Sequence, residues 1–368
     1  MKYLSEFRSG ELAKNLIKQI QEEVQSDTSY RLMEFCGGHT HTIFRYGIPD
    51  MLPKNIQLMH GPGCPVCILP MKRINAAIEL AHQPDNILCS YGDMLRVPGA
   101  EQQSLLKAKS QGADVRMIYS PAEAINIAKN EPEKNIIFFA VGFETTTPPT
   151  AVILEQAVQL KLKNLFIFCN HVLTPPAIEG IMEPAKQANE SILDGLIGPG
   201  HVSVVTGYKP YEKLAERYQV PIVISGFEPL DILHSILMLV NQINQSRHQV
   251  ENQYTRAVSS SGNQKAQNLI HQYFELREIF EWRGLGEMPK SAIKIRPEFQ
   301  DYDAEAHFTF SESKNMDNKA CECPAVLRGQ KKPNECKLFN NPCTPENPLG
   351  SCMVSSEGAC AAYFSYKG

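Results

Sequence analysis

The sequence lacks any stretch that would place the protein in or across a membrane. No segment reaches about 18 uninterrupted apolar residues, the length that a membrane-spanning helix needs. The first 20 residues alternate charged with apolar side chains and so lack the continuous apolar core of a secretory signal. A basic run and an arginine–aromatic stripe are also missing, and the formal charge is -4. We therefore expect a cytoplasmic protein that binds neither membrane nor nucleic acid.

Familiar catalytic motifs are absent as well. There is no Gly-x4-Gly-Lys-Ser/Thr, no Gly-x-Gly-x-x-Gly after a strand and no plausible Ser/His/Asp order, so nucleotide binding has no support. Extensive disorder is not expected, because 43% hydrophobic and 21% charged residues are ordinary values for a globular chain. A chain of 368 residues is long enough for two or three domains.

Cysteine, in contrast, is abundant. Eleven cysteines in a cytoplasmic protein are seldom structural disulfides, because the cytosolic thiol pool keeps ordinary pairs reduced. Metal binding or redox chemistry is therefore the leading interpretation. Six of the eleven lie in the tail, at Cys321, Cys323, Cys336, Cys343, Cys352 and Cys360.

The tail that holds these six cysteines is rich in Pro, Asn and Gly, and it has too little apolar surface to fold without a further constraint. Four thiolates can bind zinc or a 4Fe–4S cluster. Zinc sites usually show two tight Cys-x2-4-Cys pairs, and this tail has one close pair, so the spacing favours a cluster. A disulfide or simply buried thiols are the alternatives.

The region between residues 30 and 229 is predicted to be parallel α/β. Apolar β-type runs recur at residues 31–35, 56–60, 86–90, 115–119, 136–141, 165–169, 193–197 and 221–225, with helical periodicity at 70–82, 121–130 and 150–161. Periodicity leaves open one eight-unit barrel or two four-stranded open sheets. The polar stretch 129–135 resembles a hinge and favours two sheets. A helix is predicted over 267–279.

Three unusual loops each follow one of these strands. They are Cys36-Gly-Gly-His-Thr-His41, Gly61-Pro-Gly-Cys-Pro-Val-Cys67 and Gly142-Phe-Glu-Thr-Thr-Thr-Pro148. Barrels and open parallel sheets both place their chemistry at the carboxyl ends of the strands. We therefore expect the three loops to share one face.

Two of these loops carry soft ligands. Cys64 and Cys67 form a Cys-x-x-Cys motif with a proline, typical of thiol–disulfide exchange; half of a zinc knuckle is the alternative, but no second motif completes it. Cys36, His39 and His41 put a thiol and two imidazoles within six residues, which suits iron or zinc. Taken by itself, the motif is explained equally well by a tight turn with hydrogen-bonded histidines. The position of the motif beside the Cys-x-x-Cys loop favours metal binding.

The remaining candidates are less specific. The loop with Glu144 and Thr145 could bind a substrate or an anion at a helix N-terminus, or it could simply cap that helix. Cys89 and Cys169 lie inside predicted strands and are interpreted as small core residues. The Gly-Pro-Gly-His loop that ends at His201 follows a strand but has no defined role.

Six sequence blocks together carry a family resemblance. CGGHTH, GPGCPVC, GFETTTP, GFEPLD, EWRGLG and VSSEGACAAY occur in this order between Leu32 and Tyr363. With them the chain resembles the HypD family of nickel–iron hydrogenase maturation factors. Six ordered blocks are far more selective than a single Cys-x-x-Cys motif.

The resemblance implies two Rossmann-like parallel-sheet domains and a smaller, α-rich and loop-rich iron–sulfur domain formed by both termini. Together with the hinge, it predicts first and second α/β domains over residues 30–130 and 131–246. Residues 1–29 would be the N-terminal helical part of the iron–sulfur domain, and residues 247–368 its C-terminal part.

The resemblance also implies a scaffold rather than a turnover enzyme. With a small HypC-type chaperone, the protein would hold an iron atom while CO and cyanide are attached to make the Fe(CN)2CO group of the hydrogenase. A HypE-type cyanide donor would be a further partner, and the hydrogenase large subunit an indirect one. The rival interpretation is a free-standing iron–sulfur thiol–disulfide oxidoreductase, which leaves the CGGHTH block without a role.

Residue by residue, the resemblance implies that Cys36 ligates the iron with His39 beside it, and that Cys64 and Cys67 are a redox pair near the chaperone contact. Glu144 and Thr145 would line the same cleft. The cluster ligands would be Cys323, Cys336, Cys343 and Cys360. Cys321 and Cys352 would then be extra and could form a pair. Whether Cys321 rather than Cys323 is the cluster ligand stays open.

Overall fold

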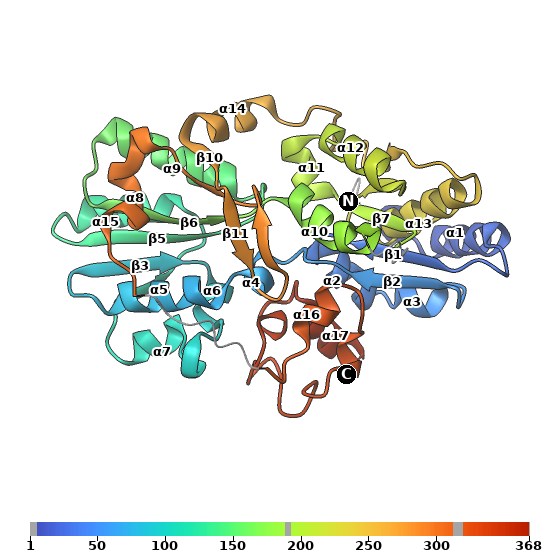
Figure 1. Cartoon of the computed structure of the whole chain (residues 1–368), viewed down its shortest axis with the longest axis horizontal. Helices are drawn as coiled ribbons and strands as arrows, with labels where there is room; N and C mark the ends of the chain where they lie inside the picture. The colour runs from blue at the N-terminus through green and yellow to red at the C-terminus, as the bar shows by residue number, and fades with distance from the viewer. Residues whose placement is uncertain (1–5, 188–192, 312–318, 368) are drawn as a thin grey trace.

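The computed structural model describes residues 6–187, 193–311 and 319–367. Within these ranges the chain forms two parallel β-sheets surrounded by helices, followed by the cysteine-rich tail (Figure 1). The predicted α/β class with two parallel-sheet domains is thereby confirmed, and the single barrel is excluded. Over the same ranges, no helix combines the length and the apolar character that crossing a bilayer requires.

All eight predicted apolar runs become strands. The five-stranded sheet contains β1 (Tyr30–Glu34), β2 (Ile56–His60), β7 (Gly195–Pro199), β8 (Ile222–Ser225) and β9 (Val250–Asn252), in the order β2-β1-β7-β8-β9. The four-stranded sheet contains β3 (Asn86–Ser90), β4 (Val115–Met117), β5 (Asn135–Gly142) and β6 (Leu165–His171), in the order β4-β3-β5-β6. Neighbouring strands are parallel in both sheets, so their carboxyl ends share one edge.

The sheets are accompanied by helices, among which those predicted over 70–82, 121–130 and 150–161 begin and end close to their predicted limits. In chain order they are α1 (Gly10–Glu23), α2 (Gly37–Arg45), α3 (Ile48–Met51), α4 (Pro65–Ile68), α5 (Met71–His82), α6 (Gly92–Arg96), α7 (Leu105–Ser110), α8 (Ala122–Asn130), α9 (Thr147–Leu160), α10 (Thr174–Gln187), α11 (Gly200–Thr206), α12 (Lys209–Tyr218), α13 (Pro229–Asn244) and α14 (Gln264–Tyr273). The helix expected over 267–279 therefore ends earlier, because residues 274–276 pair as a strand instead.

The domain boundary expected between residues 130 and 131 falls inside the four-stranded sheet. The chain starts in the five-stranded sheet with β1 and β2, crosses to build β3 to β6, and returns with β7, β8 and β9. The ranges 30–130 and 131–246 therefore each contribute strands to both sheets. The physical reason is that the apolar β5 pairs with β3 on one side and β6 on the other, and the polar stretch 129–135 is only the turn before β5.

The N-terminal helix also differs from the expectation. Ile20 of α1 is fully buried in one hydrophobic core with Ile236 and Val240 of α13, beside the five-stranded sheet. In Figure 1 α1 lies far from the cysteine-rich tail. The described part of range 1–29 thus packs on an α/β domain rather than with the tail, and residues 1–5 lie outside the described ranges.

After α14 the chain adds two small antiparallel pairs and then the tail. β10 (Phe274–Leu276) pairs with β13 (Ile293–Ile295), and β11 (Ile279–Trp282) pairs with β12 (Gly286–Pro289). They are followed by α15 (Ala304–His307), α16 (Cys323–Leu327) and α17 (Ala359–Lys367), with 3-10 turns at Pro333–Glu335 and Ser351–Met353. Cys352, Met353 and Cys360 share a core with Cys64 and Cys67, so the tail is packed against the Cys-x-x-Cys loop.

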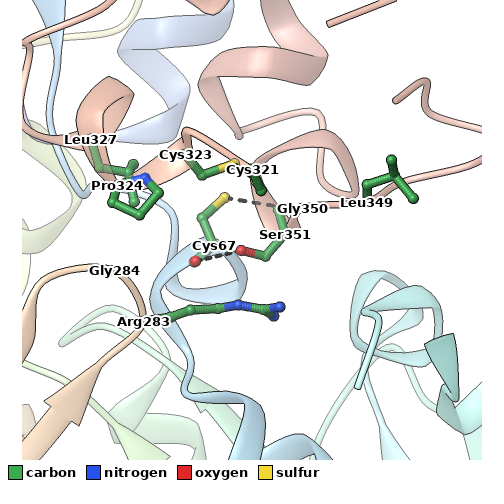
Figure 2. Close-up of a pocket in the computed structure, with 10 residues that line it drawn as sticks. All are labelled: Cys67, Arg283, Gly284, Cys321, Cys323, Pro324, Leu327, Leu349, Gly350 and Ser351. Atoms are coloured by element: carbon green, nitrogen blue, oxygen red, sulfur yellow. Dashed lines mark hydrogen bonds between the residues drawn. The ribbon is translucent and has the colours of Figure 1, made fainter. Parts of the chain in front are cut away.

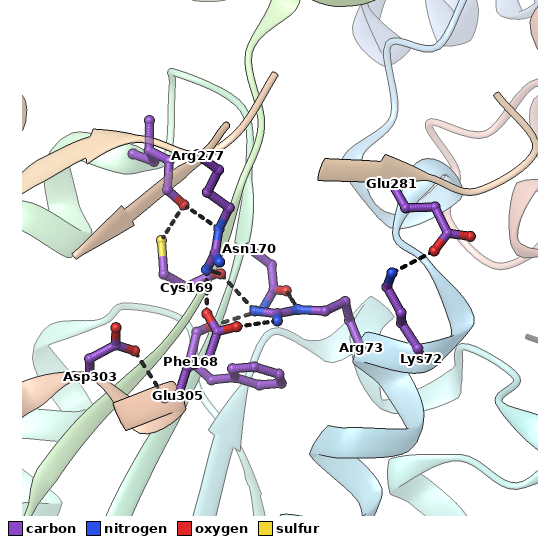
Figure 3. A network of polar contacts seen from close by, with 10 residues as sticks. Lys72, Arg73, Phe168, Cys169, Asn170, Arg277, Glu281, Asp303 and Glu305 are labelled. Carbon is purple, nitrogen blue, oxygen red and sulfur yellow. Dashed lines mark hydrogen bonds and ion pairs between the residues drawn. The ribbon is translucent and has the colours of Figure 1, made fainter. Parts of the chain in front are cut away.

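An ion-pair network fastens this late β-structure to the four-stranded sheet (Figure 3). Arg73 of α5 and Arg277 both pair with Glu305 of α15, and both donate to the main-chain oxygen of Cys169 in β6, at 3.0 and 3.2 Å. Burial alone would raise the pKa of Glu305, but the hydrogen bonds and charges of the two arginines outweigh burial and lower this pKa to about 2.

Candidate functional site

A buried carboxylate organises the edge where β1 and β2 end. Glu34 and His60 are the last residues of the two strands and lie opposite each other in the register. The Glu34 carboxylate, 1% exposed, is 2.8 Å from His60 Nδ1 and accepts hydrogen bonds from Thr40 Oγ1 and, at 2.8 Å, from the main-chain N–H of Cys36. Because these partners lie on different segments, Glu34 fixes the loop after β1 relative to β2.

Cys36 sits immediately before α2, as its N-cap residue. The Gly61–Cys67 loop presses against it, since a Cβ on Gly63 would lie only 2.4 Å from the Cys36 nitrogen. Burial raises the pKa of the Cys36 thiol, with further increases from the charges of Glu357 and Glu34, and the N–H groups of Gly38 and His39 only partly offset this. The site therefore holds a neutral thiol until a cation replaces the proton.

His39 lies in the first turn of α2 and is completely buried. Its Nε2 is 3.2 Å from the main-chain oxygen of Ser225; because a carbonyl can only accept, Nε2 carries the proton and Nδ1 carries the lone pair. Nδ1 has no hydrogen-bond partner among the described residues. Burial lowers the pKa of His39 to about 4, so at neutral pH the imidazole can act as a metal ligand.

His41 does not join His39. Its Nε2 lies 3.3 Å from the hydroxyl of Tyr366 in α17, and the two rings meet edge to face. His41 therefore makes a hydrogen bond, as the alternative interpretation of the motif expects, but it lies inside α2 rather than in a turn. The His39 imidazole is thus directed toward Ser225 of β8, and the His41 imidazole toward Tyr366 of α17.

Cys64 and Cys67 form a disulfide. Both are buried, and Cys64 caps the short helix α4. The hydroxyl of Ser351 in the tail donates to the main-chain oxygen of Cys67 at 2.6 Å. The pair therefore lies between the Cys36 loop, which contacts Gly63, and the cysteine-rich tail.

Figure 2 shows a pocket between this pair and the tail. It is lined by Cys67, Arg283, Gly284, Cys321, Cys323, Pro324, Leu327, Leu349, Gly350 and Ser351. The Cys321 and Cys323 sulfurs are 3.3 Å apart. Hydrogen bonds from the thiols of Cys321, Cys352 and Cys360 lower the pKa of Cys323, so this thiol gives up its proton more readily than an ordinary cysteine.

The structure gathers a different subset of tail cysteines from the expected four. Cys323 and Cys360 are in contact, together with Cys321 and Cys352. Cys336 and Cys343 lie near this group but bond to none of it; Cys343 Sγ accepts from the Leu349 N–H at 3.4 Å. Within the described ranges, no three Cys, His, Asp or Glu side chains already surround one point as metal ligands would. Instead, the thiol of Cys323 interacts with those of Cys321, Cys352 and Cys360.

The Glu144 loop turns inward. Glu144 is 5% exposed and accepts from the main-chain N–H and the hydroxyl of Thr174, at 2.8 and 2.9 Å, at the start of α10. Burial raises its pKa to about 7. Thr146, rather than Glu144 or Thr145, lines the open cleft of about 670 Å³ at this edge, together with Asp93, Tyr119 and Glu357. Glu144 therefore bonds to the first residue of α10 and does not cap α9, the helix that follows its own loop; the expected role in a cleft shared with Cys36 stays a prediction.

Sequence reasoning missed three residues that shape the site: Glu34, Phe227 and Glu357. Glu34 directly precedes the Cys36 motif at a strand end, which was a usable signal. Phe227 and Glu357 lie in the GFEPLD and VSSEGACAAY blocks, but nothing in their spacing revealed that Phe227 stacks on His39 or that Glu357 packs over Gly37. Cys89 and Cys169 are buried in a core, as predicted.

Comparison with known proteins extends over the whole chain. The sequence model of the family described as "HypD: Hydrogenase formation hypA family" matches residues 11–367. Similar proteins include the hydrogenase maturation factors HypD of Azotobacter vinelandii (58% identity over 367 residues; 100% of this chain, 97% of the relative), Cupriavidus necator (53% over 368; 100% and 97%) and Escherichia coli K12 (43% over 373; 100% and 98%).

Proposed function

Because the chain belongs to the HypD family and is a hydrogenase maturation factor, we propose that it is the scaffold on which the iron centre of a nickel–iron hydrogenase is built. With a HypC-type chaperone it holds an iron atom at Cys36 while CO and two cyanide ligands are attached. A HypE-type protein donates the cyanide, and the hydrogenase large subunit receives the product indirectly. The iron is therefore cargo, not a resident cofactor.

One observation carries the proposal: a half-buried thiol and a fully buried imidazole with a free lone pair lie at the start of the same helix. Cys36 and His39 are three residues apart, in the first turn of α2. The hydrogen bond between His39 Nε2 and Ser225 sets the tautomer that leaves Nδ1 for a metal. Thiolate and imidazole are ligands that iron accepts. Two ligands leave several coordination positions for CO and cyanide.

The Cys64–Cys67 pair serves as the redox dithiol of this scaffold. It contacts the Cys36 loop through Gly63 and borders the tail pocket through Cys67. A dithiol in this position can take up or release two electrons and two protons beside the iron site. Both sulfurs are buried, so exchange with large external thiols is hindered.

The tail fits an iron–sulfur cluster by its donor chemistry. The tail supplies six cysteines as soft ligands. The pKa of Cys323 is lowered by hydrogen bonds from neighbouring thiols, and Arg283 lines the same pocket as Cys321 and Cys323. When bound, a 4Fe–4S cluster supplies single electrons. We assign its ligands as Cys323, Cys336, Cys343 and Cys360. The protein's part is to bring Cys336 and Cys343 toward the other two and to exclude water with Leu327 and Leu349.

The rival function, a free-standing thiol–disulfide oxidoreductase, explains the Cys64–Cys67 pair and the tail but not the half-buried Cys36 and the buried His39. The two functions separate in the variant Cys36→Ala. The scaffold should lose iron binding and hydrogenase activation to background, because no other soft anchor is present in the loop. An oxidoreductase should keep its dithiol reduction.

The matched control is Cys89→Ala, which removes a buried thiol at the end of β3, away from the site. We expect this variant to support hydrogenase activation at the level of the unchanged protein. If Cys36→Ala also supported activation at that level, the scaffold proposal would be contradicted.

A further inference from the structure

The GFEPLD block has no part in the proposed function so far, yet its phenylalanine lies against the iron site. Phe227 belongs to the connection between β8 and α13. One face of its ring stacks on His39, with centroids 4.6 Å apart and planes 22° apart. The other face stacks on the exposed His201, at 3.7 Å and 18°. Phe227 therefore separates the buried imidazole from an exposed one.

The same ring covers the backbone next to Cys36. A Cβ on Gly38 would lie 2.8 Å from Cδ1 of Phe227, and the Cys36 sulfur is the next group on that side, at 3.9 Å. Only glycine allows the ring to approach this closely. The ring thus stacks on His39 and packs against Gly38, the residue whose Cβ position also lies 3.9 Å from the Cys36 sulfur.

Phe227 is itself fixed from three sides. Thr42 Oγ1 of α2 donates to its main-chain oxygen at 2.7 Å. The neighbouring Gly226 N–H donates to Gln253, whose amide in turn donates to the buried Asp231 carboxylate. Asp231 also accepts from the Glu228 N–H and pairs with Arg256. A ring held this firmly can determine the orientation of the imidazole stacked on it.

We infer that Phe227 is a positioning residue of the iron site: its ring holds the His39 imidazole in the rotamer that keeps Nε2 on the Ser225 carbonyl and Nδ1 available for the metal. This inference rests on the proposed function, because it requires iron at Cys36 and His39. The Ser225 carbonyl fixes which nitrogen is protonated, and the Phe227 ring fixes the plane of the imidazole. Groups outside the ligand shell commonly change metal affinity by about 10- to 100-fold.

The test is a titration of the complete protein with cobalt(II), which reports thiolate ligation through a charge-transfer absorption band. Phe227→Leu should weaken cobalt binding about tenfold, and Phe227→Tyr should restore most of the affinity. In a His39→Ala background, Phe227→Leu should have no further effect, because Phe227 acts only through His39. The matched control is Phe299→Leu, another half-buried phenylalanine packed against one aromatic ring, Tyr273, and it should leave the affinity unchanged.

Three results would overturn the inference: unchanged cobalt affinity in Phe227→Leu, an equal loss in Phe299→Leu, or an equal loss in the His39→Ala background. If Phe227→Leu fails to fold, Gly38→Ala makes the same test, because its Cβ displaces the ring; an affinity within twofold of the original protein would then count against the inference. Cys36→Ala separates the two levels. The tail thiols can give a cobalt band of their own, so the band of the Cys36 site is the part that Cys36→Ala removes. If Cys36→Ala removes no part of the band, the proposed function is contradicted. If Cys36→Ala removes a part that Phe227→Leu leaves unchanged, only this inference is contradicted.

Discussion

The Cys36 loop and the cysteine-rich tail both offer soft ligands, but they are constructed differently. In the loop, strand ends, a buried carboxylate and a helix N-terminus hold each group, and the His39 lone pair lacks a partner among the described residues. In the tail, turns and short helices carry six cysteines, and Cys323 interacts with the thiols of Cys321, Cys352 and Cys360. The fold prepares the first site before its cargo arrives. The geometry of the second depends on what it binds.

The largest expected effect is in the tail. Replacing Cys336 or Cys360 by serine should reduce iron and acid-labile sulfide to background and make the tail sensitive to proteolysis, because an unligated tail has few other constraints. Cys352→Ser is the matched variant and should keep the cluster. The reverse pattern, with Cys336 dispensable and Cys352 required, would show that the ligands come from the thiols already in contact.

The second effect is in the loop. Glu34→Ala should lower the free energy of unfolding by about 3 to 4 kcal/mol, because three hydrogen-bonding groups lose a charged, buried acceptor. Chemical denaturation measures this change. Glu212→Ala, at an exposed position in α12, should change it by less than about 0.5 kcal/mol. A loss below about 1 kcal/mol in Glu34→Ala would mean that the loop is not held as we describe.

The contrast between the two regions also explains which features could be predicted. The eight strands were evident because each is a short, largely apolar run, and the loops at their carboxyl ends followed from parallel pairing. The order of the strands could not be predicted, because local periodicity does not reveal that β5 lies between β3 and β6. Nor could the packing of α1 on α13 be predicted, because an amphipathic helix does not specify which surface it covers.

The site was predictable only in part, for related reasons. Cys36, His39, Cys64 and Cys67 stand in short motifs whose chemistry is local. Glu34 and Phe227 act through contacts between segments distant in sequence, and the inward turn of Glu144 depends on Thr174. In the tail, spacing alone could not tell which of six thiols would meet.

The third prediction concerns the ion-pair network of Arg73, Arg277 and Glu305, which lies outside both the Cys36 loop and the tail and so serves as a reference for ordinary fold stability. Glu305→Gln should lower the free energy of unfolding at pH 7 by about 2 kcal/mol, because two largely buried arginines lose their counter-charge. The pKa of Glu305 is lowered from 4.5 to about 2, so its stabilisation is complete above pH 4.5 and disappears as the pH falls toward 2.

Denaturation of both proteins at several pH values tests this. The difference between Glu305→Gln and the unchanged protein should shrink between pH 4.5 and 2, and cobalt binding at Cys36 should stay the same at pH 7. A difference independent of pH would contradict the assignment of this carboxylate as a buried ion-pair partner.

The smallest effect distinguishes the two histidines of the loop. His41→Ala removes only a hydrogen bond to Tyr366 and should change cobalt affinity by less than about twofold and stability by less than about 1 kcal/mol. His39→Ala should weaken cobalt binding at least as much as Phe227→Leu does. Equal losses in the two histidine variants would mean that the separation of their imidazoles has no functional consequence.

The most direct test of the central claim is the infrared spectrum of the protein isolated anaerobically with its small chaperone partner from cells that contain the full maturation set. We predict CO and cyanide stretching bands from one iron centre, and we predict that these bands are absent in Cys36→Ala and retained in Cys89→Ala. Bands of equal intensity in Cys36→Ala, or no bands in the unchanged protein, would contradict the scaffold function.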